Sequence, residues 1–250
     1  MSATKVDSPP YAHNWVRNNF SDFQATVRSL VSFIQSMPQI TYAGGMSVIR
    51  DRIALGLDRQ TAINAVRTTG HKKSRPYVEE FVEAFYEYDE IRKYSGLPSY
   101  DQYVAPYPIS RDIRIPVKPL IVISEEGMLK PIFVVGWATM PLTLFQRRLL
   151  MTLLEDAVFS LTDFQNSIGE FISFPHLRGS NSKKRTPLVW KRGDYGLLSP
   201  PRMKEQADLY LQALAKAKDI VAEKRKGKSD QSRPEDVESV TASAQTEMKV

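Results

Sequence analysis

The clearest pattern of hydrophobic and polar positions lies in residues 112–164. Two runs rich in β-branched residues, about 112–123 and 130–138, flank the short charged segment SEEGM. Such runs around a glycine-containing turn predict a strand pair. A long and almost entirely apolar stretch follows at about 142–162, which predicts a buried helix. The block therefore predicts the centre of a packed domain that combines strands and helices.

The chain before this block has a helical pattern. Apolar residues recur at helical spacing from Phe23 to Ile34, which predicts a helix over about 20–37. The TYAGG segment at 41–45 predicts a turn. Three more helices are expected. The first covers about 47–55, the second follows Asp58 as its N-cap and ends near Thr68, and the third runs from Pro76 to about Tyr94.

Two more strands are expected at about 169–177 and 187–190, and a closing amphipathic helix at about 201–223. These patterns predict an α+β fold: an N-terminal helical region, then a mixed α/β domain with a strand pair, a long buried helix, further strands and a closing helix. The expected segments are a flexible lead-in (1–19), the helical region (20–94), a Pro- and Tyr-rich linker (95–111), the α/β domain (112–223) and a disordered, polar tail (224–250).

Composition removes several kinds of chemistry. The 250 residues include no cysteine, which excludes disulfides, thiolate metal sites and a cysteine nucleophile. The three histidines, His13, His71 and His176, are far apart in the chain, and no glycine-rich phosphate loop is present. We therefore expect neither a metal nor another cofactor. The longest stretch without a charge, 131–145, is too short for a membrane helix, so no membrane partner and a cytoplasmic location are expected.

Positive charge suggests an anionic partner. The formal net charge is +6, with a pI near 9.4, and the excess lies mostly within residues 101–221. Residues 171–193 contain no acidic residue. The candidate phosphate contacts in this basic run are Arg178, Lys183, Lys184, Arg185, Lys191 and Arg192, and Trp190 is a candidate for stacking on a base. The alternative is an ordinary solvated loop.

A second candidate lies between the second and third helices. The segment TAINAVRTTGHKKSRPYVEEF resembles a helix-turn-helix, with small residues, then Gly70, then basic residues before the third helix. That resemblance implies DNA contact by Lys72, Lys73 and Arg75, the secondary binding candidates. Six carboxylates on the third helix oppose a polyanion unless they face away from it.

The order of elements over about 76–221 resembles the PD-(D/E)XK nuclease-like fold. That family has an aspartate after a strand-initial proline, and an acidic residue and a lysine on the next strand. The carboxylates bind a divalent ion and the lysine helps to activate water. Here Pro119 is followed by Leu120, and the next strand, IFVVGWAT, has no acidic residue and no lysine. Glu83 is at most an accessory carboxylate. The resemblance therefore implies a member without the metal ligands, and the chain is expected to lack catalytic residues.

These observations predict non-enzymatic binding of DNA or RNA through the basic run. One alternative is a divalent-metal-dependent nuclease with a rearranged site, which needs at least two carboxylates within a few ångströms of each other. The other is a protein-interaction module with no nucleic-acid role, which predicts an exposed apolar patch near Tyr100 to Tyr107. The sequence does not indicate the oligomeric state.

Overall fold

The computed structural model describes residues 9–36, 41–97, 105–176 and 184–231 and has the α+β fold that the sequence predicts. The helices are α2 (Ala12–Arg17), α3 (Phe23–Gln35), α4 (Ala43–Leu55), α5 (Arg59–Thr68), α6 (Arg75–Asp89), α7 (Leu144–Leu154), the π-helical turn η2 (Glu155–Phe159) and α8 (Pro200–Gln231). The strands are β1 (Ser95–Leu97), β2 (Ala105–Pro108), β3 (Arg114–Val117), β4 (Ile121–Glu125), β5 (Met128–Val135), β6 (Glu170–Ser173) and β7 (Leu188–Lys191).

A five-stranded mixed sheet forms the middle layer, with strand order β1-β4-β5-β6-β7. Strands β5 and β6 are parallel and are joined through α7, while the other pairs are antiparallel. Strands β2 and β3 form a separate two-stranded sheet. Because side chains alternate along a strand, the five-stranded sheet buries two apolar faces. Ile132 and Val134 of β5 face one core, and Phe133 and Val135 face the other.

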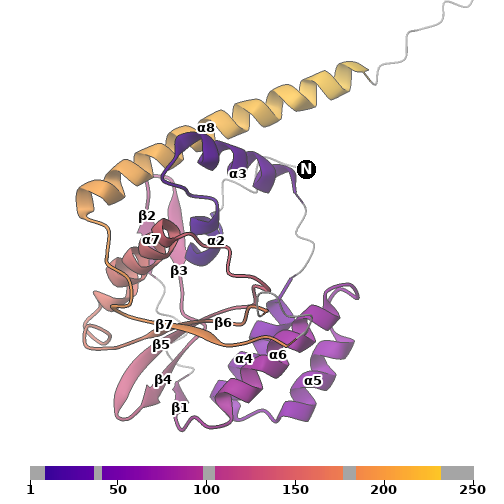
Figure 1. Ribbon diagram of the computed structural model, residues 1–250, viewed down its shortest axis with the longest axis vertical. Coiled ribbons are helices and arrows are strands. Elements are labelled where there is room, and N and C mark those ends of the chain that lie inside the picture. Colours follow the sequence, from indigo (N-terminus) through magenta and orange to yellow (C-terminus); the bar gives the residue numbers. More distant parts are fainter. Residues whose placement is uncertain (1–8, 37–40, 98–104, 177–183, 232–250) are drawn as a thin grey trace, which may run out of the picture.

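Helices α4, α5 and α6 cover the first face. Their buried side chains, including Ile49, Ile63 and Phe81, pack with Ile123 and Phe174 of the sheet side. Figure 1 shows these three helices gathered together on one side of the sheet.

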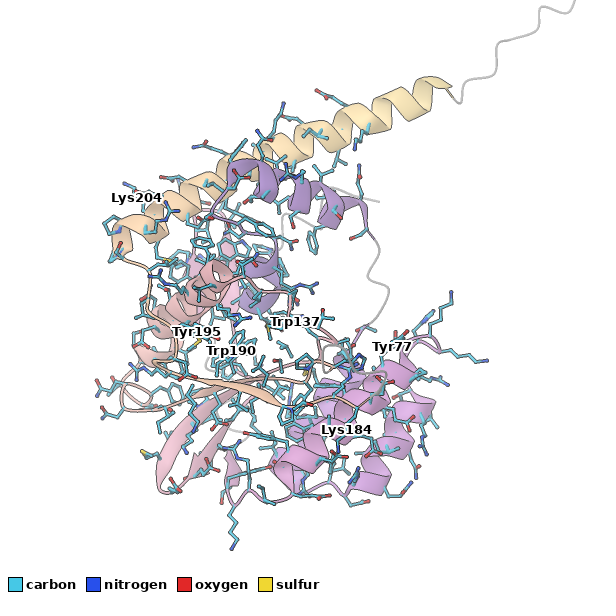
Figure 2. The ribbon with its side chains drawn as sticks, viewed as in Figure 1. Tyr77, Trp137, Lys184, Trp190, Tyr195 and Lys204 are labelled. Atoms are coloured by element: carbon cyan, nitrogen blue, oxygen red, sulfur yellow. The ribbon has the colours of Figure 1, made fainter. Side chains whose placement is uncertain are left out.

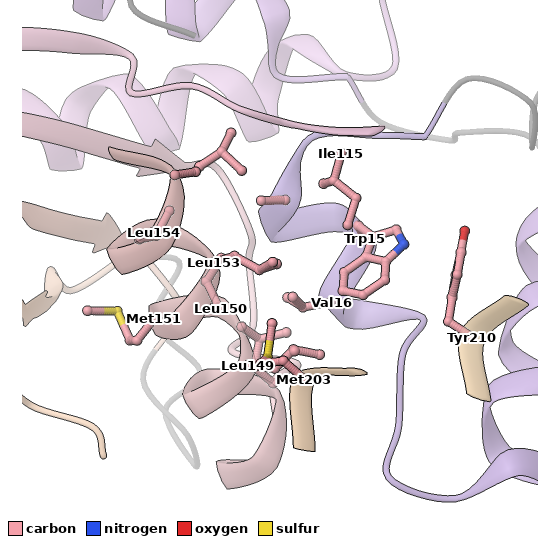
Figure 3. Close-up of a cluster of buried hydrophobic side chains, with 14 of the residues drawn as sticks. Trp15, Val16, Ile115, Leu149, Leu150, Met151, Leu153, Leu154, Met203 and Tyr210 are labelled. Carbon is pink, nitrogen blue, oxygen red and sulfur yellow. The ribbon is translucent and has the colours of Figure 1, made fainter. Parts of the chain in front are cut away.

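Helices α2, α3, α7 and α8 form the layer on the second face. Trp15 of α2 packs against Tyr210 of α8, with ring centroids 4.9 Å apart, and the leucines of α7 lie beside Val16 (Figure 3). Helix α8 lies along α3 and continues beyond it (Figure 1). The helices predicted as one N-terminal region are therefore distributed over both faces of the sheet.

Several local predictions are confirmed. The Asp58 carboxylate accepts a hydrogen bond from the Thr61 backbone N–H and caps α5. Strands β4 and β5 form a hairpin around Glu126 and Gly127, whose φ angles of 54° and 76° fit a two-residue turn. Proline lies in the first turn of α6.

Other local predictions are wrong. Gly44 and Gly45 of the predicted TYAGG turn belong to α4, because Gly45 gives α4 room to approach Phe81 of α6. The predicted linker 95–111 contains β1 and β2, and β1 extends the central sheet. The predicted strand 112–123 is two strands of different sheets, β3 and β4, separated at Pro119.

The ends of the chain also differ from the prediction. The lead-in contains α2, since Trp15 and Val16 are buried against α7 and α8. Helix α8 continues to Gln231, into the segment predicted as a disordered tail, and residues 232–250 lie outside the described residues.

Candidate nucleic-acid interface

Arg185 is buried at the carboxyl ends of β5 and β6. No part of its side chain is exposed, and its guanidinium donates hydrogen bonds to four oxygen atoms. The acceptors are the carbonyls of Gly136, Phe174 and Tyr77 and the hydroxyl of Tyr42, at 3.0–3.4 Å. The prediction that Arg185 contacts phosphates is wrong, because its side chain is buried and both terminal nitrogens donate to acceptors inside the protein.

The Arg185 side chain joins two segments that are distant in the sequence. Its hydrogen bond to the Tyr77 carbonyl attaches the segment around residue 185, which precedes β7, to the first turn of α6. Close to it, His176 Nε2 lies 3.2 Å from a carboxylate oxygen of Glu80, again on α6. The basic run and the predicted helix-turn-helix loop therefore lie at the same side of α6.

The six carboxylates of the third predicted helix all have cationic partners. Those partners are Arg67 for Glu79, His176 and Arg185 for Glu80, Arg59 for Glu83 and Glu90, Lys184 for Glu87, and Arg52 for Asp89. The electrostatic objection to an anion near α6 is thus weaker than the sequence suggests, because neighbouring cations offset this acidic surface.

Lys184 lies across this acidic surface. Its Nζ is 3.0 Å from a carboxylate oxygen of Glu87, and both side chains are largely exposed, at 65% and 45%. Glu83 and Arg185 line the same shallow hollow of about 390 Å³. Exposed ion pairs contribute only about 0–1 kcal/mol. A phosphate can therefore replace Glu87 as the partner of Lys184 at little cost.

Trp190 and Arg192 both make contacts inside the protein. Trp190 is only 3% exposed. One face of its ring stacks on Phe171, and the guanidinium of Arg147 lies 5.2 Å from the ring centroid, so no base can stack on it. Arg192 is bound to both carboxylate oxygens of Glu155 and to the carbonyls of residues 164, 165 and 167. It holds η2 to the following loop, and its side chain is partly exposed, so the predicted phosphate contact stays a prediction.

The remaining predicted residues differ in exposure. Lys72, Lys73 and Lys191 are exposed. Arg75 donates hydrogen bonds to the carbonyls of Thr68, Thr69 and Gly70 and so closes the end of α5. Arg178 and Lys183 lie outside the described residues.

Tyr77 is a surface residue that the basic pattern alone does not single out. Its side chain is 41% exposed, beside the segments that carry Lys73 and Arg185. Figure 2 shows Tyr77 and Lys184 beside the layer formed by α4, α5 and α6, and Trp190 in the interior. Helical spacing offers a signal for Tyr77, because the buried positions Val78 and Phe81 leave it outside the apolar face of α6.

A second polar cluster lies at the opposite end of α6. Arg92 binds Glu125 of β4 and Glu170 of β6, and Lys130 of β5 binds Glu125 at 2.7 Å. Hydrogen bonds from Arg92 lower the pKa of Glu125 to about 2, with help from Lys130 and against the effect of burial. Burial likewise raises the pKa of Tyr88, which donates to Glu170, to about 12. The cluster ties the end of α6 to three strands.

The rival functions can be compared with these positions. In the part of the chain that the structure describes, no group of three or more histidine or carboxylate side chains is arranged to hold a metal ion. Of the patch predicted near Tyr100 to Tyr107, residues 98–104 lie outside the described ranges, and Tyr107 is half-buried against the second core.

Comparison with known proteins adds no relative: no family description, curated protein or solved structure matches this chain. Within the described ranges, no helix has the length and apolar character needed to cross a bilayer.

Proposed function

We propose that this protein binds nucleic acid without cleaving it, through the surface beside α6 where Lys72, Lys73 and Lys184 are exposed. The observation that carries the proposal is the linkage by Arg185. It attaches the segment that bears Lys184 to the helix start that follows Lys72 and Lys73. Two basic segments separated by more than a hundred residues in the sequence thus contribute to one surface. A cytoplasmic location is part of the proposal.

Phosphate recognition suits these lysines. A lysine ammonium on a flexible stem contacts a phosphate without strict geometry. The carboxylates of α6 are paired with arginine, histidine or lysine side chains, so they oppose a polyanion less than unpaired carboxylates would. Arg185 and Trp190 contribute by holding the surface in shape and not by touching the ligand.

The test is a salt series. The purified protein is titrated with labelled single-stranded and duplex DNA and RNA, with and without Mg²⁺, and cleavage is scored in the same tubes. The variant Lys72→Gln/Lys73→Gln/Lys184→Gln removes three exposed charges. Each lost phosphate contact reduces the slope of log K against log salt by about 0.7–0.9, so the slope should fall by about two to three units.

A matched control removes the same charge elsewhere. Lys204, Lys216 and Lys224 are exposed on α8, which lies on the other face of the sheet. Changing these three to glutamine should leave the salt slope close to that of the wild type. Equal slopes for both triple variants would contradict the proposed surface, and Mg²⁺-dependent cutting would favour the nuclease alternative.

A further inference from the structure

A second group of aromatic and basic side chains, of which Tyr11 and Arg17 are exposed and His13 and Trp137 are partly buried, lies on the α2 side of the sheet. Tyr11 is 50% exposed and precedes α2. Its ring is nearly parallel to that of His13, with centroids 6.0 Å apart and an interplanar angle of 11°. The His13 ring in turn meets the edge of Trp137, with centroids 5.8 Å apart.

Arg17 completes the group. Its guanidinium carbon lies 5.2 Å from the centroid of the Trp137 ring. The Arg17 residue is exposed, and partial burial of its guanidinium lowers its pKa, with no carboxylate of the described residues acting on it. This differs from the arginines beside α6, which are paired with glutamates. A guanidinium that no carboxylate of the described residues neutralises favours an anionic ligand.

The His13 ring is neutral at physiological pH. Burial first, and the charge of Arg17 second, lower the pKa of His13 to about 4. The group therefore offers uncharged ring faces next to one cation. This is the composition that binds unpaired bases together with their phosphates, since every base has a face that stacks on an aromatic ring.

This group adjoins the proposed nucleic-acid interface. Trp137 follows Gly136, whose carbonyl accepts a hydrogen bond from Arg185. Arg185 also binds the Tyr77 carbonyl at the start of α6. Figure 2 shows Trp137 and Tyr77 near the same end of the sheet. The carboxyl end of β5 thus lies between the two surfaces.

We propose that Tyr11, His13, Trp137 and Arg17 form a stacking site for unpaired nucleotides, so that the ligand is single-stranded nucleic acid. The inference rests on the proposed function and makes it more specific. An unpaired base stacks on the exposed ring of Tyr11, and Arg17 binds the adjoining phosphate. A duplex does not use the site, because its bases are already stacked on one another.

The experiment uses the full chain, a short oligo(dT) strand that carries 2-aminopurine, and a blunt-ended DNA duplex. Tyr11→Ala should weaken binding of the single strand about five- to tenfold and leave duplex binding unchanged. Tyr11→Phe should retain binding, since it keeps the ring. Arg17→Gln should weaken single-strand binding more than Arg28→Gln, which removes an exposed charge from α3.

Intrinsic fluorescence reports contact at the site directly. The chain has three tryptophans, and Trp15 and Trp190 are only 2% and 3% exposed. Quenching by the single strand should therefore come from Trp137 and disappear in Trp137→Phe. Thermal melting of each variant shows whether it is folded.

The outcomes separate the two proposals. If Tyr11→Ala and Tyr11→Phe bind the single strand as well as the wild type, the stacking site is wrong. The lysine surface still stands in that case, provided that the triple lysine variant weakens both ligands. Binding of the duplex alone would also overturn the stacking site only. No binding of either ligand at low salt would overturn both proposals.

Discussion

Replacing Arg185 by methionine should destabilise the protein strongly, although the residue lies in a basic run that the sequence predicts to be exposed. The methionine keeps most of the volume but removes every donor. Three backbone carbonyls and the Tyr42 hydroxyl then lose a buried hydrogen bond, and Glu80 keeps only His176 as its cationic partner. Removing one member of such a buried charged group costs about 3–5 kcal/mol. Because a chain of this size loses about 2–4 °C per kcal/mol, the melting temperature should fall by roughly 6–20 °C.

Urea and thermal unfolding of the wild type and the Arg185→Met variant provide the measurement. Lys191→Met is the matched control, because this lysine belongs to the same basic run but is exposed. Its free energy of unfolding should stay within about 0.5 kcal/mol of the wild type. Arg185→Lys should lie between the two, since it keeps the charge but cannot reach all four acceptors. If Arg185→Met has the same free energy of unfolding as the control, the buried network does not exist and Arg185 is again a candidate phosphate contact.

Two further predictions test the packing and the electrostatics. Because the folded pKa of His13 is about 4 against an ordinary 6.5, the unfolded chain binds the extra proton, and stability should fall by about 2–3 kcal/mol from pH 6.5 to 4.5. His13→Phe should remove this loss in urea unfolding at both pH values, whereas an unchanged loss would exclude His13 as its source. Gly96→Ala should lower the free energy of unfolding by about 1–3 kcal/mol, since the added Cβ would lie 2.3 Å from the Ile53 carbonyl oxygen. Gly44→Ala is the control, because its Cβ would meet only the Thr69 hydroxyl at 3.8 Å, and it should be neutral or stabilising by up to about 1 kcal/mol. Equal losses of stability in the two glycine variants would contradict the close approach of α4 and β1 at Gly96.

Features that depend on neighbours in the sequence were predictable. The Asp58 cap needs only a backbone N–H three residues later, and the turn at Gly127 needs only local backbone freedom. The apolar periodicity of α3 is likewise a local pattern that survives folding. Helix α2 was missed because its six residues are too few for a periodic signal, and packing of Trp15 and Val16 against distant helices stabilises it.

The candidate site was predictable only in part. Lys72, Lys73, Lys184 and Lys191 are exposed, as a basic run suggests. Whether an arginine in such a run is exposed depends on acceptors that come from elsewhere in the chain. For Arg185 these include the Gly136 carbonyl, which no local pattern marks as its partner.

The stacking group illustrates the same limit. Tyr11 and Trp137 are more than a hundred residues apart and come from segments that carry no basic run. Their association depends on the packing of α2 against the end of β5, which brings His13 between them. Residue types alone therefore offered no signal for this site.

The sequence by itself determined the α+β class, most of the helices, the central hairpin and the excess of positive charge. Each of these follows from periodicity, local backbone preference or composition, and none requires knowledge of distant contacts. Only the tertiary structure decided that the helices divide between two faces of one sheet, that Arg185 and Trp190 are buried, and that Arg185 attaches the segment bearing Lys184 to the start of α6. The physical reason is that burial of a charged or aromatic side chain is favourable only where partners from distant segments satisfy it, and those partners meet only when the chain has folded.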